Sequence, residues 1–133
     1  TNGNALARYI TTPINLADGF DASNIVVTVD INRPASTNVK VYYKALSSGS
    51  ATPITDEIWY EMDLESAVPS SINGFDYREH RFFPPNAFDQ YGVPADNPII
   101  ARFNTFQIKI VMLSSTVTRT PKLRDLRIIA LDV

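Results

Sequence analysis

The chain has 133 residues, with 12 Lys or Arg against 14 Asp or Glu, and it contains no cysteine. This length fits one domain, and the lack of cysteine excludes disulfide bridges and thiolate metal ligands. A net charge of −2 gives no overall attraction to phosphate backbones or anionic lipid, so we expect neither nucleic acid nor a membrane as partner. Because the chain begins with Thr1, we interpret residues 1–133 as a single domain excised from a longer polypeptide.

The charges are unevenly distributed along the chain. Residues 102–133 carry six basic and two acidic side chains, whereas residues 1–101 carry six basic and twelve acidic ones. One interpretation is a basic patch that contacts an acidic partner. The other, which we favour, is that the late strands pair with earlier, acidic strands of the same sheets.

Alternation of apolar and polar residues predicts the first β-strands. Residues 6–11 are the first candidate, and residues 25–31 (IVVTVDI) then place an apolar side chain at every second position. Residues 39–45 (VKVYYKA) repeat this pattern, and the segment 33–38 (RPASTN) between the two has the composition of a turn. We therefore expect 25–31 and 39–45 to form an antiparallel pair.

Later segments have the same strand character, with β-branched and aromatic residues bounded by polar or proline-containing stretches. They are 57–63, 77–83, 103–113 and 123–131. Helical signals at 64–67 and 87–90 are weak, because Pro69 and Pro94 follow them closely. The sequence thus predicts an all-β fold, a single antiparallel two-sheet β-sandwich of about seven or eight strands, jelly-roll-like or alternatively immunoglobulin-like.

Two connections between the expected strands are long. They are residues 47–55 (SSGSATPIT) and residues 84–98 (PPNAFDQYGVPADNP). Long loops on a rigid scaffold often carry function, so we expect contacts with partners in these two loops.

Reactive side chains are few. His80 is the only histidine and is flanked by charged residues, so we interpret it as an exposed side chain without a catalytic role. Several carboxylates around residues 57–63 offer pairs for glycoside hydrolysis, but an edge strand kept soluble by charge explains them more simply. They are Asp56, Glu57, Glu61, Asp63 and Glu65. The sequence predicts a protein that is not an enzyme, with no catalytic residue and no cofactor.

The oxygen-bearing side chains of segment 18–24 (DGFDASN) are the best candidates for a calcium ion. They are Asp18, Asp21 and Asn24, with Asp96 and Asn97 as a weaker second pair. The spacing matches no EF-hand loop. We favour the alternative, in which the segment forms a tight turn with Phe20 packed below it, and we predict no metal ligand.

Aromatic side chains offer a carbohydrate site, since sugar rings stack on flat aromatic faces. The candidates are Trp59, Tyr60, Tyr77 and Tyr91. Alternation along residues 57–63 places Trp59 on an exposed face and Tyr60 in the core. Apolar loop residues offer a protein contact as the alternative, and these are Phe82, Phe83, Phe88 and Tyr91.

Residues 7–45 contain the motifs YIT at 9–11, LADGFDA at 16–22 and VKVYYK at 39–44, and the chain closes with TPKLRDLRIIAL at 120–131. In these segments the chain resembles a β-sandwich module found in virion structural proteins of large tailed bacteriophages. Tail, baseplate and fibre-associated polypeptides carry that module. The resemblance covers both ends of the chain and does not extend over residues 47–98.

The resemblance implies a non-enzymatic assembly or attachment role in the tail or baseplate of a virion. The implied partners are other virion proteins or the rest of the parent chain, and a homo-oligomer is among the assemblies it allows. The alternative function is a carbohydrate-binding module, which serves host-surface recognition or is appended to a hydrolase. We therefore expect a virion location and hold glycan binding open.

Overall fold

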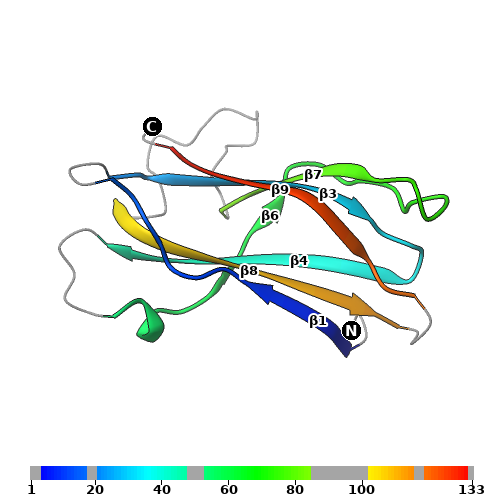
Figure 1. The fold of residues 1–133 in the computed structure, drawn as a ribbon, viewed down its shortest axis with the longest axis horizontal. Coiled ribbons are helices and arrows are strands. Elements are labelled where there is room, and N and C mark those ends of the chain that lie inside the picture. Colours follow the sequence, from blue (N-terminus) through cyan, green and yellow to red (C-terminus); the bar gives the residue numbers. More distant parts are fainter. Residues whose placement is uncertain (1–3, 18–20, 48–52, 85–101, 116–118, 132–133) are drawn as a thin grey trace.

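The computed structural model describes residues 4–17, 21–47, 53–84, 102–115 and 119–131. Within these ranges the chain forms nine β-strands in two antiparallel sheets, which pack against each other as a β-sandwich (Figure 1). The expected all-β, two-sheet class is confirmed. No helix in the described ranges is long and apolar enough to cross a membrane.

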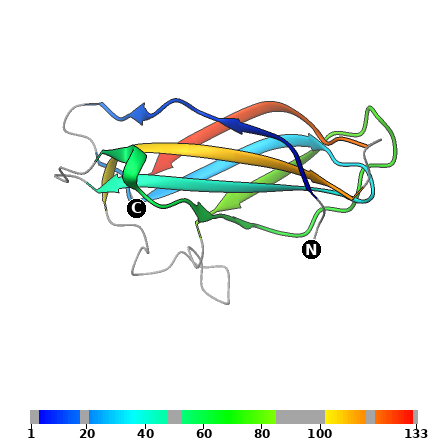
Figure 2. The ribbon, with the colours of Figure 1, turned by 90° about the horizontal axis from the view of Figure 1, so that it is seen from below.

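One sheet has five strands and forms the lower layer of Figure 1. Its order is β1 (Asn4–Ile10), β8 (Phe103–Ser114), β4 (Thr37–Ser47) and β5 (Tyr60–Glu61), and β2 (Ile14–Asn15) also pairs with β8. Figure 2 views this sheet from its outer side, with β8 and β4 running along the length of the molecule.

The other sheet has four strands and forms the upper layer of Figure 1. Its order is β6 (Asp63–Leu64), β7 (Arg78–Phe83), β3 (Asn24–Asn32) and β9 (Lys122–Leu131). A single turn of 3-10 helix, η1 (Ile54–Asp56), precedes β5.

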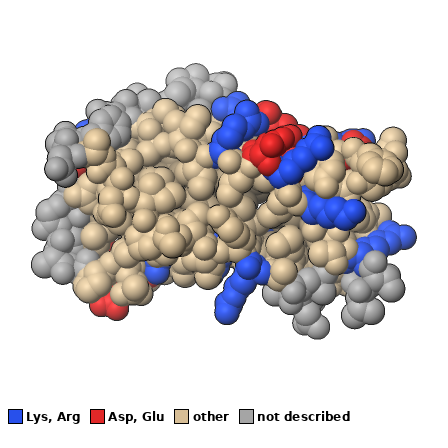
Figure 3. All heavy atoms as spheres, in the orientation of Figure 1, with Lys and Arg blue, Asp and Glu red and all other residues tan. Residues whose placement is uncertain are grey.

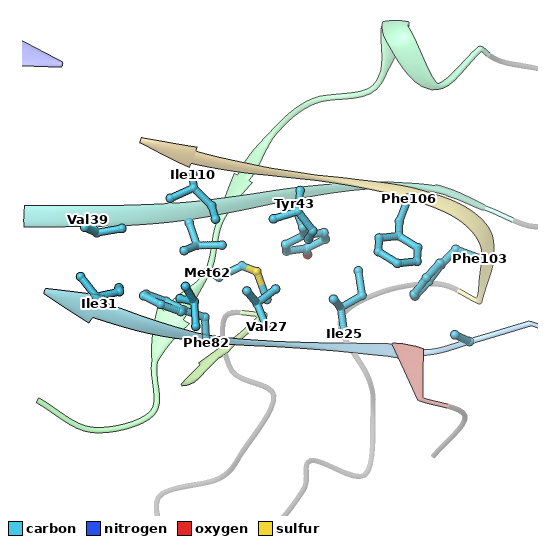
Figure 4. Close-up of a cluster of buried hydrophobic side chains, with 14 residues drawn as sticks. Ile25, Val27, Ile31, Val39, Tyr43, Met62, Phe82, Phe103, Phe106 and Ile110 are labelled. Atoms are coloured by element: carbon cyan, nitrogen blue, oxygen red, sulfur yellow. The ribbon is translucent and has the colours of Figure 1, made fainter. Parts of the chain in front are cut away.

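The core fills the space between the two sheets (Figure 4). Each central strand points every second side chain inward, so the four inward residues of β3 face apolar residues of β4 and β8. These inward residues of β3 are Ile25, Val27, Val29 and Ile31, all with no exposed surface. Opposite them lie Val39, Val41, Tyr43, Phe103, Phe106, Ile108 and Ile110.

β3 and β4 do not pair with each other, so the expected antiparallel pair of 25–31 and 39–45 is wrong. β3 pairs with β7 and β9, whereas β4 pairs with β8 and β5. Each of these two strands has one strongly apolar face. When β3 and β4 face each other across the core, both apolar faces are buried at once. The connection between β3 and β4 passes from one sheet to the other. Within it, the Arg33 guanidinium donates hydrogen bonds to the carbonyls of Thr37 and Val68, each at 2.9 Å.

Residues 57–63 do not form one strand either. The chain makes β5 in the five-stranded sheet, passes through Met62, and then makes β6 in the other sheet. Met62 is buried, and its N–H donates to the Val41 carbonyl at 2.8 Å. The segment therefore links the edges of the two sheets. Residues 64–67 form no helical turn, since Leu64 ends β6 and residues 65–66 form a bend, and residues 87–90 lie outside the described residues.

Charged side chains gather on the right of the upper layer in Figure 3, where Lys or Arg lie beside Asp or Glu. Two ion pairs join β9 to earlier strands: Arg124 lies 3.8 Å from Asp30 and Arg127 lies 3.3 Å from Glu79. The expectation that late basic residues pair with earlier acidic strands is confirmed for β9.

Candidate functional site

His80 is buried, with 4% of its surface exposed, so its interpretation as an exposed side chain is wrong. It lies opposite Val29 in the β3–β7 ladder and therefore points into the sandwich, where its ring stacks on Phe82. Its Nδ1 lies 2.8 Å from the Arg78 carbonyl. Because a carbonyl can only accept, Nδ1 carries the proton and Nε2 is an acceptor.

A cavity of about 670 Å³ lies beside His80, at the side of the sandwich where β4, β5 and β6 run. Apolar side chains that line it include Val39, Met62 and Phe82. The His80 Nε2 atom is buried and has no hydrogen-bond partner among the described residues. His80 is one of the residues that line this cavity, and polar side chains such as Thr37 and Asn38 line it as well.

Of the five carboxylates around residues 57–63, Glu61 lies in β5 of one sheet and Asp63 in β6 of the other. Glu61 lies 3.9 Å from Lys40, and Glu65 lies 3.3 Å from Arg81. Two of these carboxylates are therefore engaged in ion pairs on the surface.

The candidate calcium segment is described only from Asp21 onward, and Asp18, Phe20, Asp96 and Asn97 lie outside the described residues. The Asp21 backbone carbonyl accepts from Arg102 at 3.1 Å. The Asn24 side chain accepts from the Ile25 N–H at 2.9 Å, at the start of β3. Within the described ranges, no three His, Cys, Asp or Glu side chains gather into a metal-binding group.

The structure places the aromatic candidates in different environments. Tyr60 is 53% exposed, so its expected core position is wrong, and Trp59 is half-buried. Tyr77 lies under the Arg124 guanidinium at 4.0 Å. Phe82 and Phe83 are buried in β7, so their expected role as loop contacts is wrong. Phe88 and Tyr91, with most of the loop 84–98, lie outside the described residues, as do 48–52.

Cations and aromatic rings gather on the outer face of the five-stranded sheet. We call this group the lysine–aromatic patch, and it consists of Arg8, Tyr42, Lys44, Trp59 and Lys109. Tyr42 of β4 lies directly opposite Lys109 of β8, and Lys44 lies opposite Gln107 on the same face. The Lys109 ammonium is 4.7 Å from the centres of both the Tyr42 and Trp59 rings.

Lys44 is the most enclosed member of the patch. Only 6% of its surface is exposed, and its ammonium lies 4.7 Å from the centre of the Trp59 ring. Trp59 therefore lies against two ammonium groups, an arrangement that the ring quadrupole favours. Burial lowers the pKa of Lys109, and the nearby charges of Arg8 and then Lys44 lower it further.

A second unusual surface is the loop formed by residues 70–76. Two hydrogen bonds tie Ser71 to Arg33: the Ser71 N–H donates to the Arg33 carbonyl at 2.8 Å, and the Arg33 N–H donates to the Ser71 side-chain Oγ at 2.9 Å. The buried Asn32 side chain donates to the carbonyls of Asn73 and Asp76 at 2.7 and 3.0 Å.

Asp76 closes the 70–76 loop from within. Its carboxylate accepts from the Ile72 N–H at 2.9 Å and pairs with Arg78 at 3.0 Å. The side-chain hydrogen bond from Arg78, followed by the one from the Ile72 backbone, holds the pKa of Asp76 below its ordinary value.

This hydrogen-bonded 70–76 loop presents two apolar side chains to solvent. Ile72 is 81% exposed and Phe75 is 93% exposed. The Asn73 side chain fixes the backbone beneath the ring by accepting from the Phe75 N–H at 2.9 Å. Beside the loop lies a hollow of about 680 Å³, whose lining includes Arg119 and Lys122.

Comparison of the chain with models of known protein families, with curated proteins and with solved structures finds no match. Of the residues on these two surfaces, the sequence pointed to Trp59 alone as a candidate for binding. Lys44 and Lys109 could be placed on outward faces by alternation, but only the pairing of β4 with β8 brings them together. Ile72 and Phe75 could be noticed as apolar residues within the polar loop SSINGFD.

Proposed function

We propose that this chain is a non-enzymatic assembly module, a β-sandwich held in a larger protein particle by contacts of the 70–76 loop. The observation that carries the proposal is the exposure of Ile72 and Phe75 on a loop that hydrogen bonds hold in one conformation. Large apolar side chains that dominate protein–protein binding are typically buried only in the complex.

Rigidity of the 70–76 loop matters to this role. A loop ordered before binding loses less conformational entropy on association, so more of its contact energy is available for affinity. Asn32 and Arg33 of the sandwich supply this order from below, through bonds to Asn73, Asp76 and Ser71. The exposed pair Ile72 and Phe75 is therefore suited to insert into an apolar pocket of another subunit.

The setting of this module in a virion tail or baseplate is part of the proposal and rests on the sequence resemblance at residues 7–45 and 120–131. Its test is the gene of the parent polypeptide. Tail or baseplate genes beside it would support the virion setting, and genes of carbohydrate metabolism beside it would favour the alternative function.

A photo-crosslinking experiment tests the assembly contact itself. Phe75 is replaced by a benzophenone-bearing phenylalanine in the protein as it is naturally produced, and the assembled particle is irradiated. We expect a covalent link from position 75 to one defined protein subunit. The matched control places the same group at Ile129, an apolar residue of β9 that is 52% exposed.

Serine substitutions complete the test. Ile72→Ser with Phe75→Ser should release the module from the particle and leave its free energy of unfolding within about 0.5 kcal/mol, because both side chains are exposed. Ile129→Ser should leave assembly unchanged. Equal crosslinking from positions 75 and 129, or normal assembly of the double variant, would rule out this contact.

Carbohydrate binding is the second candidate function, and one observation favours it. Trp59 and Tyr42 lie in the lysine–aromatic patch on the outer face of a sheet, and neither is fully buried. Aromatic rings on a rigid sheet surface are the usual platform for a sugar ring.

A further inference from the structure

We propose that the lysine–aromatic patch binds an acidic sugar, with Arg8 and Lys109 beside its anionic group, the buried Lys44 adding its positive charge, and Trp59 and Tyr42 against the sugar ring. The inference deepens the second candidate function, carbohydrate binding, on which it rests. It depends neither on the 70–76 loop nor on the virion setting.

Strand register brings the patch together from three strands. Tyr42 and Lys109 are direct cross-strand neighbours on β4 and β8, and Ile10 of β1 lies on the other side of Lys109. Arg8 is two residues before Ile10 and therefore points to the same outer face. Trp59, which directly precedes β5, contacts Lys44 and Lys109. These backbone positions are fixed by the longest ladders of the sheet.

The charges of the patch are not neutralised within the described ranges. The ion pairs between described residues involve Lys40, Arg78, Arg81, Arg124 and Arg127 as cations. Arg8, Lys44 and Lys109 are in none of them. The nearest acid by register is Glu61, opposite Tyr42, and its carboxylate lies beside Lys40.

Three cations held together without a carboxylate repel one another, and burial removes part of the hydration of Lys44 and Lys109. The lowered pKa of Lys109 reflects both effects. Contacts with aromatic rings offset part of this cost, and a bound anion would offset more of it through hydrogen bonds to charged donors. The charge of the patch therefore selects an anionic ligand.

The aromatic rings of the patch indicate which class of anionic ligand fits it. A simple acidic peptide has no flat surface to place on Trp59 or Tyr42, whereas the apolar face of a pyranose ring does. Single-stranded nucleic acid also combines charge with stacking, but it requires a groove that follows several phosphates. The patch offers only three cations, and the protein as a whole has a net charge of −2. A single acidic sugar unit therefore fits the patch better than a strand with several phosphates does.

Trp59 is the only tryptophan of the chain, so its fluorescence reports directly on the patch. The purified protein is titrated with oligogalacturonate, whose sugars carry carboxylates, and with its methyl ester, which has the same rings without charge. We expect a saturable fluorescence change with the charged form and at least about tenfold weaker binding of the ester. Binding should weaken when salt is raised from about 0.05 M to about 0.5 M.

Chondroitin sulfate and unsulfated chondroitin, which share the same carboxylate-bearing chain, distinguish sulfate from carboxylate as the anionic group. Tighter binding of the sulfated form assigns sulfate, equal binding of the two assigns carboxylate, and either result supports an acidic sugar. Lys109→Gln should weaken binding at least about tenfold, because it removes one charged donor. The control Lys122→Gln, at an exposed lysine that starts β9, should bind as the wild type does.

Several results would overturn the inference. Equal binding of oligogalacturonate and its methyl ester would show a carbohydrate site that does not select for charge. If polyglutamate or an oligo-dT strand bound as tightly as oligogalacturonate, the patch would be assigned to another class of ligand. Unchanged affinity of a folded Lys109→Gln variant, or no binding of either acidic glycan, would remove the patch as the site. Crosslinking at Phe75 is measured separately, so failure here and failure of the assembly role can be told apart.

Discussion

At the scale of single residues, His80 couples the core to pH. Burial lowers its pKa below the ordinary value of 6.5, the hydrogen bond to the Arg78 carbonyl opposes this, and Arg33 and Asp30 have smaller, opposite effects. The unfolded chain therefore takes up a proton at a higher pH than the folded chain does. Between the two values the unfolded state holds more protons, so stability falls on acidification.

We predict that the free energy of unfolding of the wild type falls between about pH 7.5 and about pH 5.5, above the range in which carboxylates titrate. His80→Asn keeps a side-chain donor for the Arg78 carbonyl and cannot titrate. It should be less stable at neutral pH and should lose less on acidification. Urea unfolding at several pH values measures both, and parallel pH profiles of the two proteins would contradict the prediction.

Single residues also mark how far the sequence alone can identify a site. The charged neighbours Glu79 and Arg81 suggested an exposed His80, although alternation with Phe82 places it on the inner face. For Lys44 and Lys109, alternation predicts outward side chains but not their proximity. The two are 65 positions apart in the sequence, and only the β4–β8 ladder brings them together. Alternation is a local pattern, so it cannot show which distant residues strand pairing brings together at a site.

At the scale of elements, a β-bulge in β9 explains why its alternation changes phase. Thr28 lies opposite Arg127 and Asp30 opposite Arg124, so Asp125 and Leu126 together oppose Val29. Leu123 packs against the core before the bulge, and the apolar set Leu126, Ile128 and Ala130 follows after it. Asp125 has a φ of 53°, in the left-handed region that one residue of such a bulge adopts.

We predict that Asp125→Val lowers the free energy of unfolding by about 1–2 kcal/mol, because a β-branched residue is strained at positive φ. Asp125→Gly and Asp125→Asn should stay within about 0.5 kcal/mol of the wild type, since both tolerate this conformation and the exposed pair with Arg124 contributes little. Urea unfolding measures all three. A valine variant as stable as the wild type would show that the left-handed geometry carries no cost.

Strand positions were largely predictable, and strand partners were not. Residues 25–31, 39–45 and 103–113 lie within β3, β4 and β8, because period-two burial is a local property of each strand. The β3–β4 pair was wrong, because two strands with matching apolar faces can pair in one sheet or face each other across a core. The segment 57–63 also read as one strand, since its β5 and β6 portions are separated only by Met62.

At the scale of the whole molecule, the strands of both sheets differ in how firmly they are held. β8 pairs with β1, β2 and β4, and β3 pairs with β7 and β9, so both strands are hydrogen-bonded along two sides. Their inward residues have little or no exposed surface. β2, β5 and β6 are two residues long, and each pairs with a single neighbour. Opening of these short strands breaks few contacts, whereas opening of β3 or β8 divides the core.

We therefore predict a wide spread of amide exchange rates in the native protein. Amides such as those of Val27, Val29, Ile108 and Ile110 should exchange last, because they are exposed only when the core opens and so report the free energy of global unfolding. Amides of β5 and β6 should exchange through local opening and remain insensitive to low urea concentrations. Hydrogen exchange followed by NMR at increasing urea separates the two classes. The prediction would be contradicted if the amides of residues 60–64 were as protected as those of β3 and as sensitive to urea. The link through Met62 between the two sheets would then belong to the cooperative core. The side of the sandwich that holds the cavity beside His80 would in that case open only on global unfolding.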